Sequence, residues 1–464
     1  MQLADPALPK PSTESNIYEV GTLRYTTRGL FVLFIWLLWG DFAFTFFESI
    51  FGRFIPLYLK DLQASNTLIG VMTGSFVGLV NLFFLPNISQ WSDTSRGRWG
   101  RRIPFLYAVT PLTVASLVLI GFAPELGAWL HDHAIARFAP GVSVTTVILS
   151  LLCVLVVSFH FFNMTLVNAY GWLQRDVVPE RVMARFLSWF RIVGTVSSFL
   201  FLWFVFPHVV SRRREVCSGV GLFYLVSFFL MCWNVKEGEY PPPPPKDSRP
   251  GIFKSFALYF RECLRIPIYR NFFIVYILVL FATLSVGPFS VLFARDTLGL
   301  DMDNMGKIFA WGTGVSLLVY APMGLLCERF TPLRVTLYSL AGFVLASLLA
   351  FFLVHDKTTF MIYTIASSVP AVGWALGQGT ATMSLFPGEK FGQFSSGLNV
   401  FGCAGLILGN YAMGKFMDLL HSNYRLSFLW SAAFFALAII PMVRVYSDWK
   451  KYGGPHHYVP PLPD

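Results

Sequence analysis

The most constraining feature of this sequence is a series of twelve apolar segments, each long enough to cross a lipid bilayer. Their approximate ranges are 29–58, 66–91, 103–123, 143–173, 183–209, 216–234, 271–295, 304–327, 333–355, 358–385, 395–420 and 424–446. A spanning helix needs about 20 apolar residues, and a spanning segment must satisfy its own backbone hydrogen bonds. The sequence therefore predicts an all-α polytopic membrane protein with twelve transmembrane helices.

Composition agrees with this fold class and excludes others. Only 13% of the residues are charged, against about 25% in an average soluble protein. The net charge of +10 would suggest nucleic-acid binding in a soluble chain. In a membrane protein, basic residues collect in cytoplasmic loops, so we expect no nucleic-acid partner. The six cysteines include no CxxC pair, and we expect neither a metal site nor a disulfide framework.

The distribution of Lys and Arg predicts the organisation of the chain. The loops that share a side with the two termini hold most of the basic residues, which places both tails in the cytoplasm of a cell (inner) membrane protein. A run of five prolines at 241–245 and an amphipathic stretch at 253–266 follow the sixth segment. The predicted parts are an N-terminal tail (1–28), a six-helix bundle (29–234), a cytoplasmic linker (235–270), a second six-helix bundle (271–446) and a C-terminal tail (447–464).

Two short turns mark equivalent positions in the two halves. Residues 92–102, SDTSRGRWGRR, join the second and third segments, and residues 324–334, GLLCERFTPLR, join the eighth and ninth. A feature repeated at one position of two six-helix halves is typical of a duplicated transporter. We expect their charges to form a cytoplasmic gate that breaks when the inside opens. The gate residues are Asp93, Arg96, Arg98, Arg101, Arg102, Glu328, Arg329 and Arg334.

These features resemble the major facilitator superfamily. The stretch SDTSRGRWGRRIPF is similar to the equivalent loop of the glycoside-pentoside-hexuronide:cation symporters and the related sucrose transporters. Gly40–Ala43, Asp176–Glu180 and Ser396–Val400 are similar to further patches of that group. The resemblance implies two pseudo-symmetric six-helix bundles and secondary transport of a sugar or glycoside by alternating access.

A carboxylate near the middle of the first segment is the leading candidate for ion coupling. Asp41 lies about twelve residues into the segment, or roughly 18 Å from its start. A carboxylate at that depth is costly unless it faces a cavity, pairs or is protonated. Glu48 lies two turns further on the same face. The pair suggests a proton path, with Asp41 also touching substrate; the alternative is a hydrogen bond to a neighbouring helix.

Further polar residues are candidates for substrate binding. Asn168 and Trp172 share a face of the fourth segment, and in the melibiose-type carriers that the chain resembles an acid and a tryptophan at this spacing hold the sugar. Trp172 could instead be an interfacial belt residue. Arg191 in the fifth segment needs an anionic partner, and we expect Asp41 to supply it. Gln378 and Asn399 are expected to line the cavity from the second half.

The second segment differs from the sodium-coupled members of the resembled group. Their two carboxylates correspond here to Asn81 and Leu85. Leucine supplies no oxygen ligand, so proton coupling or no coupling is favoured over sodium, with Asn81 kept as a coupling candidate and no cofactor expected. Lys415 and Asp418, three residues apart, are interpreted as a structural pair or part of an outer gate.

The sequence thus predicts a proton-coupled secondary transporter of a sugar or glycoside. One alternative is an exporter of amphipathic compounds or lipids, suggested by the 48 phenylalanines. Another is a membrane receptor or scaffold that acts through the linker and tails. HExxH, GxSxG and P-loop motifs do not occur, so an enzyme is not expected. The expected partners are a small-molecule substrate and the bilayer, and the chain is expected to be monomeric.

Overall fold

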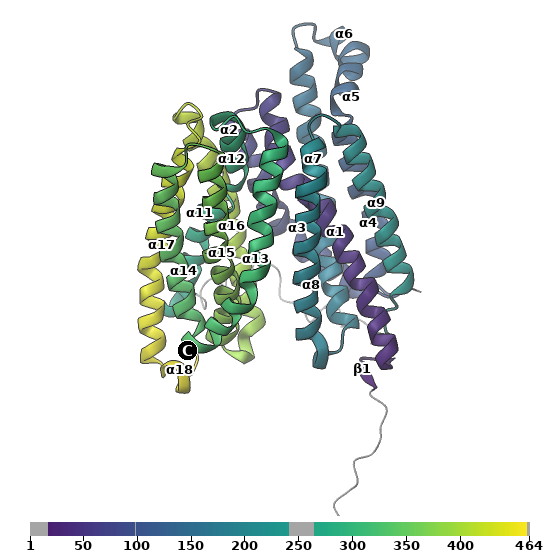
Figure 1. The fold of residues 1–464 in the computed structure, drawn as a ribbon. Coiled ribbons are helices and arrows are strands. Elements are labelled where there is room, and N and C mark those ends of the chain that lie inside the picture. The colour runs from purple at the N-terminus through teal and green to yellow at the C-terminus, as the bar shows by residue number, and fades with distance from the viewer. Residues whose placement is uncertain (1–16, 98, 241–263, 462–464) are drawn as a thin grey trace, which may run out of the picture.

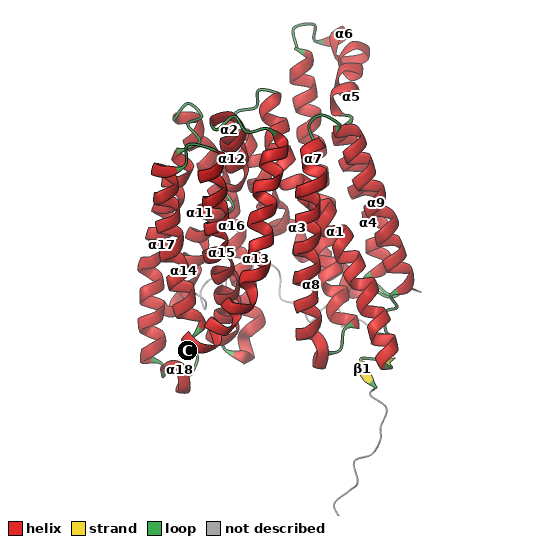
Figure 2. Cartoon of the chain, viewed as in Figure 1, coloured by secondary structure: helices red, strands yellow, loops and turns green. Residues whose placement is uncertain are grey.

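The twelve predicted segments are present as helices. The computed structural model describes residues 17–97, 99–240 and 264–461. In this part of the chain twelve helices are long and apolar enough to cross a membrane, which confirms the all-α prediction. Figures 1 and 2 show these helices side by side, joined by short loops, with the C-terminus and β1 (Tyr18–Val20) at the same end. The proline run 241–245 and residues 253–263 of the amphipathic stretch lie outside the described residues.

The first six spanning segments form the N-terminal half. They are α1 (Thr27–Asp61), the continuous run α2 (Asn66–Gly70), η1 (Val71–Ser75) and α3 (Phe76–Thr94), then α4 (Ile103–Gly121), α7 (Val144–Val177), the run α8 (Glu180–Leu200), η3 (Phe201–Val205) and η4 (Phe206–His208), and finally α9 (Arg213–Asn234). The short turns η1 and η3 are π-helical. Such turns inside a helix are often found at functional sites.

The last six segments form the C-terminal half. They are the interrupted run α11 (Pro267–Thr283), α12 (Gly287–Leu292) and η6 (Phe293–Thr297), then α13 (Met302–Phe330), α14 (Pro332–Leu353), α15 (Lys357–Leu385), the run η7 (Gly388–Lys390) and α16 (Phe391–Leu419), and α17 (Leu426–Lys451). The break at residues 284–286 gives this half a discontinuous helix, a feature of transporter binding sites. The short α18 (Gly454–His457) follows.

The two halves repeat one packing scheme. In the N-terminal half α1 packs on α8 and α9, and α4 packs on α7 and α9. In the C-terminal half α11 packs on α16 and α17, and α14 packs on α15 and α17. These pairs are the same when the helices are numbered one to six within each half. The equivalence is the internal repeat that the paired turns predicted from the sequence.

Several helices begin where a side chain caps their free backbone N–H groups. Thr26 accepts from the N–H of Gly29 at 3.2 Å, and Asp301 accepts from the N–H of Asn304 at 3.0 Å. Asp356 forms a capping box with Thr359 at the start of α15. Such caps contribute about 1 kcal/mol each. They place the helix starts within a few residues of the ends that hydropathy predicts.

The first helix is longer than the apolar segment that predicts it. The predicted segment 29–58 contains Arg53 but ends before Lys60, whereas α1 runs on to Asp61. Arg53 therefore lies well inside the spanning helix, eight residues from its end. Between α4 and α7 the structure also has the unpredicted helices α5 (Ala123–Leu130), η2 (His131–Ile135) and α6 (Ala136–Phe138). They rise at the end opposite the termini in Figure 1.

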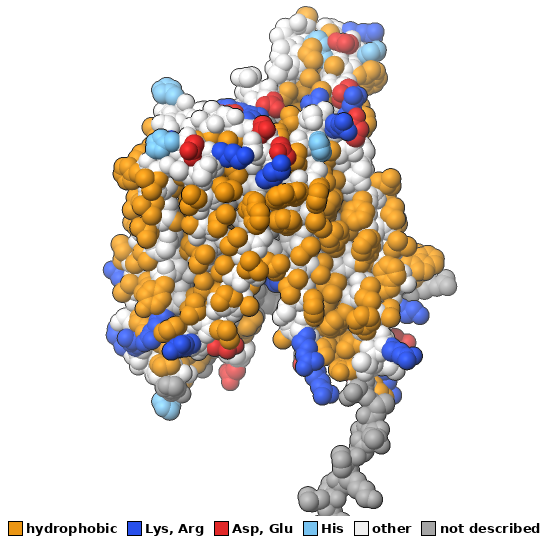
Figure 3. Space-filling view, viewed as in Figure 1, with side chains coloured by type: hydrophobic (Ala, Val, Ile, Leu, Met, Phe, Trp, Pro, Cys, Tyr) orange, Lys and Arg blue, Asp and Glu red, His pale blue; other side chains and the backbone are white. Residues whose placement is uncertain are grey.

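Side chains on the surface divide into a belt and two ends. Figure 3 shows hydrophobic side chains covering the middle of the visible face, while Lys, Arg, Asp and Glu gather at the two ends. Large exposed apolar side chains include Phe31, Phe83, Leu318, Tyr338 and Leu345. A soluble protein rarely exposes so large an apolar surface. The belt marks the part of the molecule that lies in the bilayer.

In the part of the chain that the structure describes, the two halves pack together toward one end of the molecule and separate toward the other. We call the end that carries β1 and α18 the terminal end and the opposite end the far end. Contacts between the halves join α16 to α2, η1 and α3, α13 to α8, and α1 to α12. A Cβ on Gly414 of α16 would lie 2.5 Å from the carbonyl oxygen of Asn66, so only glycine permits this approach. At the terminal end the space-filling view shows a hollow between the halves (Figure 3).

Candidate functional site

Hydrogen bonds to Asp418 close the far end of the molecule. The carboxylate of Asp418 on α16 accepts from the backbone N–H groups of Asn66 at 2.8 Å and Thr67 at 2.9 Å. It also accepts from the Asn66 amide at 2.9 Å and the Thr67 hydroxyl at 2.5 Å. Lys415, the expected partner of Asp418, forms no ion pair with it. We call Asp418, Asn66 and Thr67 the far-end latch, because they join one half to the other.

An ion pair also crosses between the halves at the far end. Arg295 of η6 binds Asp61 at the end of α1, with 2.7 Å between nitrogen and oxygen. The side chains are partly exposed, so this pair contributes at most about 1 kcal/mol. Of the arginine triplet at 212–214, Arg214 pairs with Glu125 at 3.6 Å, which links α9 to α5 within one half. The Asp418 bonds are the largest group of polar contacts between the halves, and Asn66 adds bonds to Ser422 and Tyr424 at 2.8 and 2.9 Å.

The predicted gate residues at the terminal end pair within their own half. Asp93 binds Arg102 at 2.5 Å and Arg101 at 3.8 Å, and Asp176 binds the same two arginines at 3.2 and 2.8 Å. Arg96 donates to the backbone oxygen of Asp93 at 2.7 Å. Arg98 lies outside the described residues. In the described ranges none of these charges reaches the C-terminal half.

The second turn likewise makes no bridge between the halves. Glu328 is exposed and forms no ion pair in the described part of the chain. The Arg329 guanidinium lies 5.5 Å from the Phe330 ring, and Arg334 donates to the Tyr446 hydroxyl at 2.6 Å. The gate that the sequence predicts is thus not assembled in this conformation, which is open at the terminal end.

Glu237, which was not predicted as a site residue, holds the first turn in place. Its carboxylate accepts from the backbone N–H groups of Arg101, Arg102 and Ile103 at 2.9, 2.8 and 2.6 Å. It thereby caps the start of α4 with a negative charge, where the helix dipole favours one. Tyr240 donates to Glu237 at 2.9 Å. Burial and then the neighbouring Glu237 and Asp176 carboxylates raise the pKa of Tyr240, so it remains a hydrogen-bond donor.

Asp41 lies deep in the N-terminal half with few partners. Its side chain is 1% exposed, and one oxygen accepts from the Thr45 hydroxyl at a long 3.5 Å. The second oxygen, Oδ2, has no hydrogen-bond partner among the described residues. Gly194 of α8 lies opposite, where an added Cβ would come within 3.3 Å of that oxygen. Asp41 is therefore an unpaired carboxyl group at the packed α1–α8 contact.

The expected ion pair between Asp41 and Arg191 is not formed. Arg191 lies on α8, one turn before Gly194, but its side chain is exposed and makes no ion pair with Asp41 in the described structure. Glu48 is exposed despite its place on a spanning helix, and its one polar contact is the Asn163 amide at 3.5 Å. Neither side chain lines the cavity between the halves that is described below. Their roles in coupling and binding stay predictions.

The remaining predicted residues do not gather around one point. Three amides bond within their own helices, since Asn81 and Asn168 donate to the backbone of Val77 and Met164, and Gln378 donates to Thr382. Asn399 is exposed. The Trp172 ring stacks under the Arg102 guanidinium at 4.9 Å, next to the first turn. The sugar-binding role of Trp172 and its alternative role as an interfacial residue both stay predictions.

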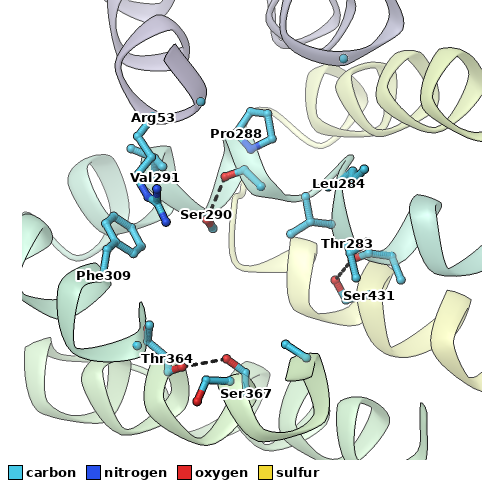
Figure 4. Close-up of a pocket in the computed structure, with 18 of the residues that line it drawn as sticks. Arg53, Thr283, Leu284, Pro288, Ser290, Val291, Phe309, Thr364, Ser367 and Ser431 are labelled. Atoms are coloured by element: carbon cyan, nitrogen blue, oxygen red, sulfur yellow. Dashed lines mark hydrogen bonds between the residues drawn. The ribbon is translucent and has the colours of Figure 1, made fainter. Parts of the chain in front are cut away.

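A cavity between the halves contains Arg53, which was not predicted as a site residue. It has a volume of about 690 Å³ and is bounded by α1, η1 and α3 of the N-terminal half and by α11 to α17 of the C-terminal half. Figure 4 shows Arg53 pointing into it from α1, above Phe309, with Thr364 and Ser367 on the opposite wall. Its other lining residues include the aromatic side chains of Phe51, Phe343, Phe360, Tyr363 and Phe435. Pockets of 300–1,000 Å³ are typical of small-molecule sites.

Comparison with known families identifies the class of protein. The family model described as MFS/sugar transport protein matches residues 37–386, which is most of the chain. The chain belongs to this family. The major facilitator fold predicted from the sequence is thereby confirmed, and this MFS protein is a transporter of a solute. The match includes the first turn, Asp41 and Arg53.

Solved structures share the fold of this MFS protein at low sequence identity. A bacterial homologue of the iron transporter ferroportin in an inward-facing state has a TM-score of 0.64 at 16% identity, over 90% of this chain and 99% of that one. A bacterial homolog of the human lysosomal transporter Spinster, also inward-facing, has a TM-score of 0.66 at 14% identity, over 91% of this chain and 97% of that one. A variant of the nucleoside transporter NupG has a TM-score of 0.65 at 13% identity, over 89% of this chain and 100% of that one. At this identity they show the fold alone.

Proposed function

We propose that this MFS protein is a proton-coupled secondary transporter of a polyhydroxylated solute of the sugar class. The observation that carries the proposal is the Asp41 carboxyl group, which is buried in a spanning helix with one oxygen unpartnered. A charged carboxylate in such a place costs several kcal/mol. A group that takes up a proton when enclosed and releases it when hydrated is the basic requirement of a proton carrier.

The cavity chemistry supports a hydroxylated solute. Around the cavity the hydroxyls of Thr313, Thr364 and Ser431 donate to backbone oxygens at 3.0, 2.8 and 2.8 Å. Their own oxygens remain free to accept hydrogen bonds from solute O–H groups. Aromatic rings on the same walls offer flat apolar surface to the C–H face of a sugar ring. The family description, MFS/sugar transport protein, points to the same class.

The α8 helix links the proton site to the movement of the halves. Its Gly194 lies against Asp41, and its Phe199 lies against Gly314 of α13 in the other half. A change in the charge of Asp41 therefore acts on the α1–α8 contact and, through α8, on the interface between halves. With the far-end latch closed and the terminal end open, positive-inside orientation makes this the inward-facing state.

Solute uptake into liposomes tests the proposal. Purified full-length protein is reconstituted and supplied with labelled sugars, sugar alcohols and glycosides, with the outside two pH units more acidic than the inside. At least one hydroxylated solute should accumulate, and a protonophore should abolish the accumulation. Equal uptake with and without the gradient across the panel, or movement of lipophilic compounds alone, would contradict the proposal.

A further inference from the structure

Arg53 is a cation placed within the membrane and directed into a cavity. It lies eight residues before the end of α1, or about 12 Å inside the helix terminus. Figure 4 shows its side chain extending from α1 into the space between the two halves, toward Phe309 of α13. The guanidinium carbon lies 5.0 Å from the centre of the Phe309 ring. This contact directs the charge into the cavity. An arginine that served only as a topological anchor would instead extend toward water at the far-end surface.

Arg53 has no counter-charge in the described part of the chain. No ion pair or hydrogen bond engages its guanidinium, and it is the one charged residue among the described residues that line the cavity. Asp61, on the same helix, already binds Arg295 at 2.7 Å. Glu48 contacts Asn163 and does not line the cavity. The Phe309 contact contributes about 0.5–2 kcal/mol but leaves the positive charge uncompensated.

A second group in the cavity also lacks a partner. Asn410 of α16 is 1% exposed, and its side-chain oxygen has no hydrogen-bond partner among the described residues. Its amide nitrogen already donates to the backbone oxygen of Leu406 at 2.9 Å. That oxygen is itself buried, and a Cβ added to Gly74 of η1 would lie 2.3 Å from it, so Asn410 belongs to the packed contact between η1 and α16. Arg53 is therefore the group that is available to a solute in the cavity.

We propose that Arg53 binds an anionic carboxylate or phosphate group of the transported solute, whose hydroxyl groups face the hydroxyl-lined walls of the cavity. This inference rests on the proposed function and narrows its substrate class. A guanidinium offers five N–H donors in a planar fork that matches two oxygens of a carboxylate or phosphate. An unpaired arginine in the membrane is costly, and an anionic solute removes that cost only while it is bound.

Equilibrium binding to purified full-length protein in detergent tests this inference without any gradient. The probes are glucose, galactose and mannose, each compared with its 6-carboxylate and its 6-phosphate. The wild-type protein should bind a charged member at least tenfold more tightly than the neutral sugar of the same ring. Whether the 6-carboxylate or the 6-phosphate binds more tightly shows which anionic group the site recognises. No preference for a charged member in any of the three rings, or no binding by any charged probe, overturns the inference.

Arginine variants locate the preference. Arg53→Gln should abolish it, and Arg53→Lys should keep part of it, because lysine retains the charge but not the fork. Arg214→Gln is the matched control, since it removes an arginine at the far end that pairs with Glu125 at 3.6 Å, and it should leave the preference unchanged. An Arg53→Gln protein that still prefers the charged probe contradicts the inference.

A stability measurement separates a binding role from a structural role. Without ligand, Arg53→Gln should raise Tm by about 2 °C or more, since it removes an uncompensated charge. A structural arginine would lower Tm when replaced. If Arg53→Gln fails to fold, the preference of the wild-type protein for charged over neutral sugars still tests the inference. If neutral and charged sugars bind equally well, this inference fails but the proposed function is unaffected. If the protein prefers anionic sugars but shows no gradient-driven uptake, only the proton coupling is refuted.

Discussion

Replacing Asp41 by asparagine is expected to abolish the accumulation of solute driven by a pH gradient. Two pH units supply about 2.7 kcal/mol per proton, enough for roughly hundredfold accumulation of a solute that moves with one proton. An amide has almost the same size as the carboxyl group but carries no exchangeable charge. The Asp41→Asn protein should therefore equilibrate solute without concentrating it, as measured by labelled solute inside reconstituted liposomes.

A second aspartate provides the control for Asp41. Asp303, at the far end, pairs with Lys307 at 2.6 Å and its side chain is half exposed. Asp303→Asn should accumulate solute as the wild-type protein does. Full accumulation by Asp41→Asn, with the gradient intact, would show that the proton travels by another group. Glu48, two turns along α1, would then be the next group to replace.

Removing the carboxylate of Asp418 is expected to open the far end. Its four hydrogen bonds to Asn66 and Thr67 form only while the halves are closed there. Bonds to a charged acceptor contribute about 1.5–3 kcal/mol each, so a net loss of about 3 kcal/mol shifts the equilibrium roughly a hundredfold toward the far-end-open state. The measurement is labelling of Ser367→Cys, in a background without the six native cysteines, by a membrane-impermeant thiol reagent added on the far side.

The expected result is a labelling rate at least ten times that of the parent protein. Asp356→Ala is the matched control, because Asp356 also accepts two hydrogen bonds at the far end but from Thr359 of the same helix. It should not change the labelling rate. A slow rate in Asp418→Ala, equal to that of the control, would contradict the role of Asp418 in closing the far end.

The fold was predictable because the bilayer restricts what apolar segments can do. Hydropathy located the sixth helix at 216–234, against Arg213–Asn234 in the structure, and the other spans with similar errors. The ends shift because polar caps and turns, which hydropathy does not detect, decide where a helix starts. Arg53 lies within the predicted segment 29–58, but hydropathy gives no sign of the cavity that its side chain enters.

Partners across the two halves could not be predicted in the same way. Asp418 and Asn66 are separated by 352 residues, and no local pattern relates them. The spacing of Lys415 and Asp418 favoured a pair on one helix, but the open backbone N–H groups at the start of α2 bind the carboxylate instead. Glu237 was missed for the same reason, because its partners are backbone groups at the start of α4.

Among the predicted site residues, Asp41 is the one whose surroundings fit its predicted chemistry most closely. Its depth in α1 could be read from the sequence, but its burial and its unpartnered oxygen depend on the direction of its side chain. The expected pairing with Arg191 depended on side-chain direction, which the sequence does not specify. The amides of Asn81, Asn168 and Gln378 found partners on their own helices, as short polar side chains in helices commonly do.

The most direct test of the account is whether solute movement itself carries protons. Liposomes containing the protein and a pH-sensitive dye, with no pH gradient at the start, are given an inward gradient of a transported solute. We expect the interior to acidify with wild-type protein and not with Asp41→Asn, while labelled solute still enters through both. Solute entry through the wild-type protein without any change in internal pH would contradict proton coupling at Asp41.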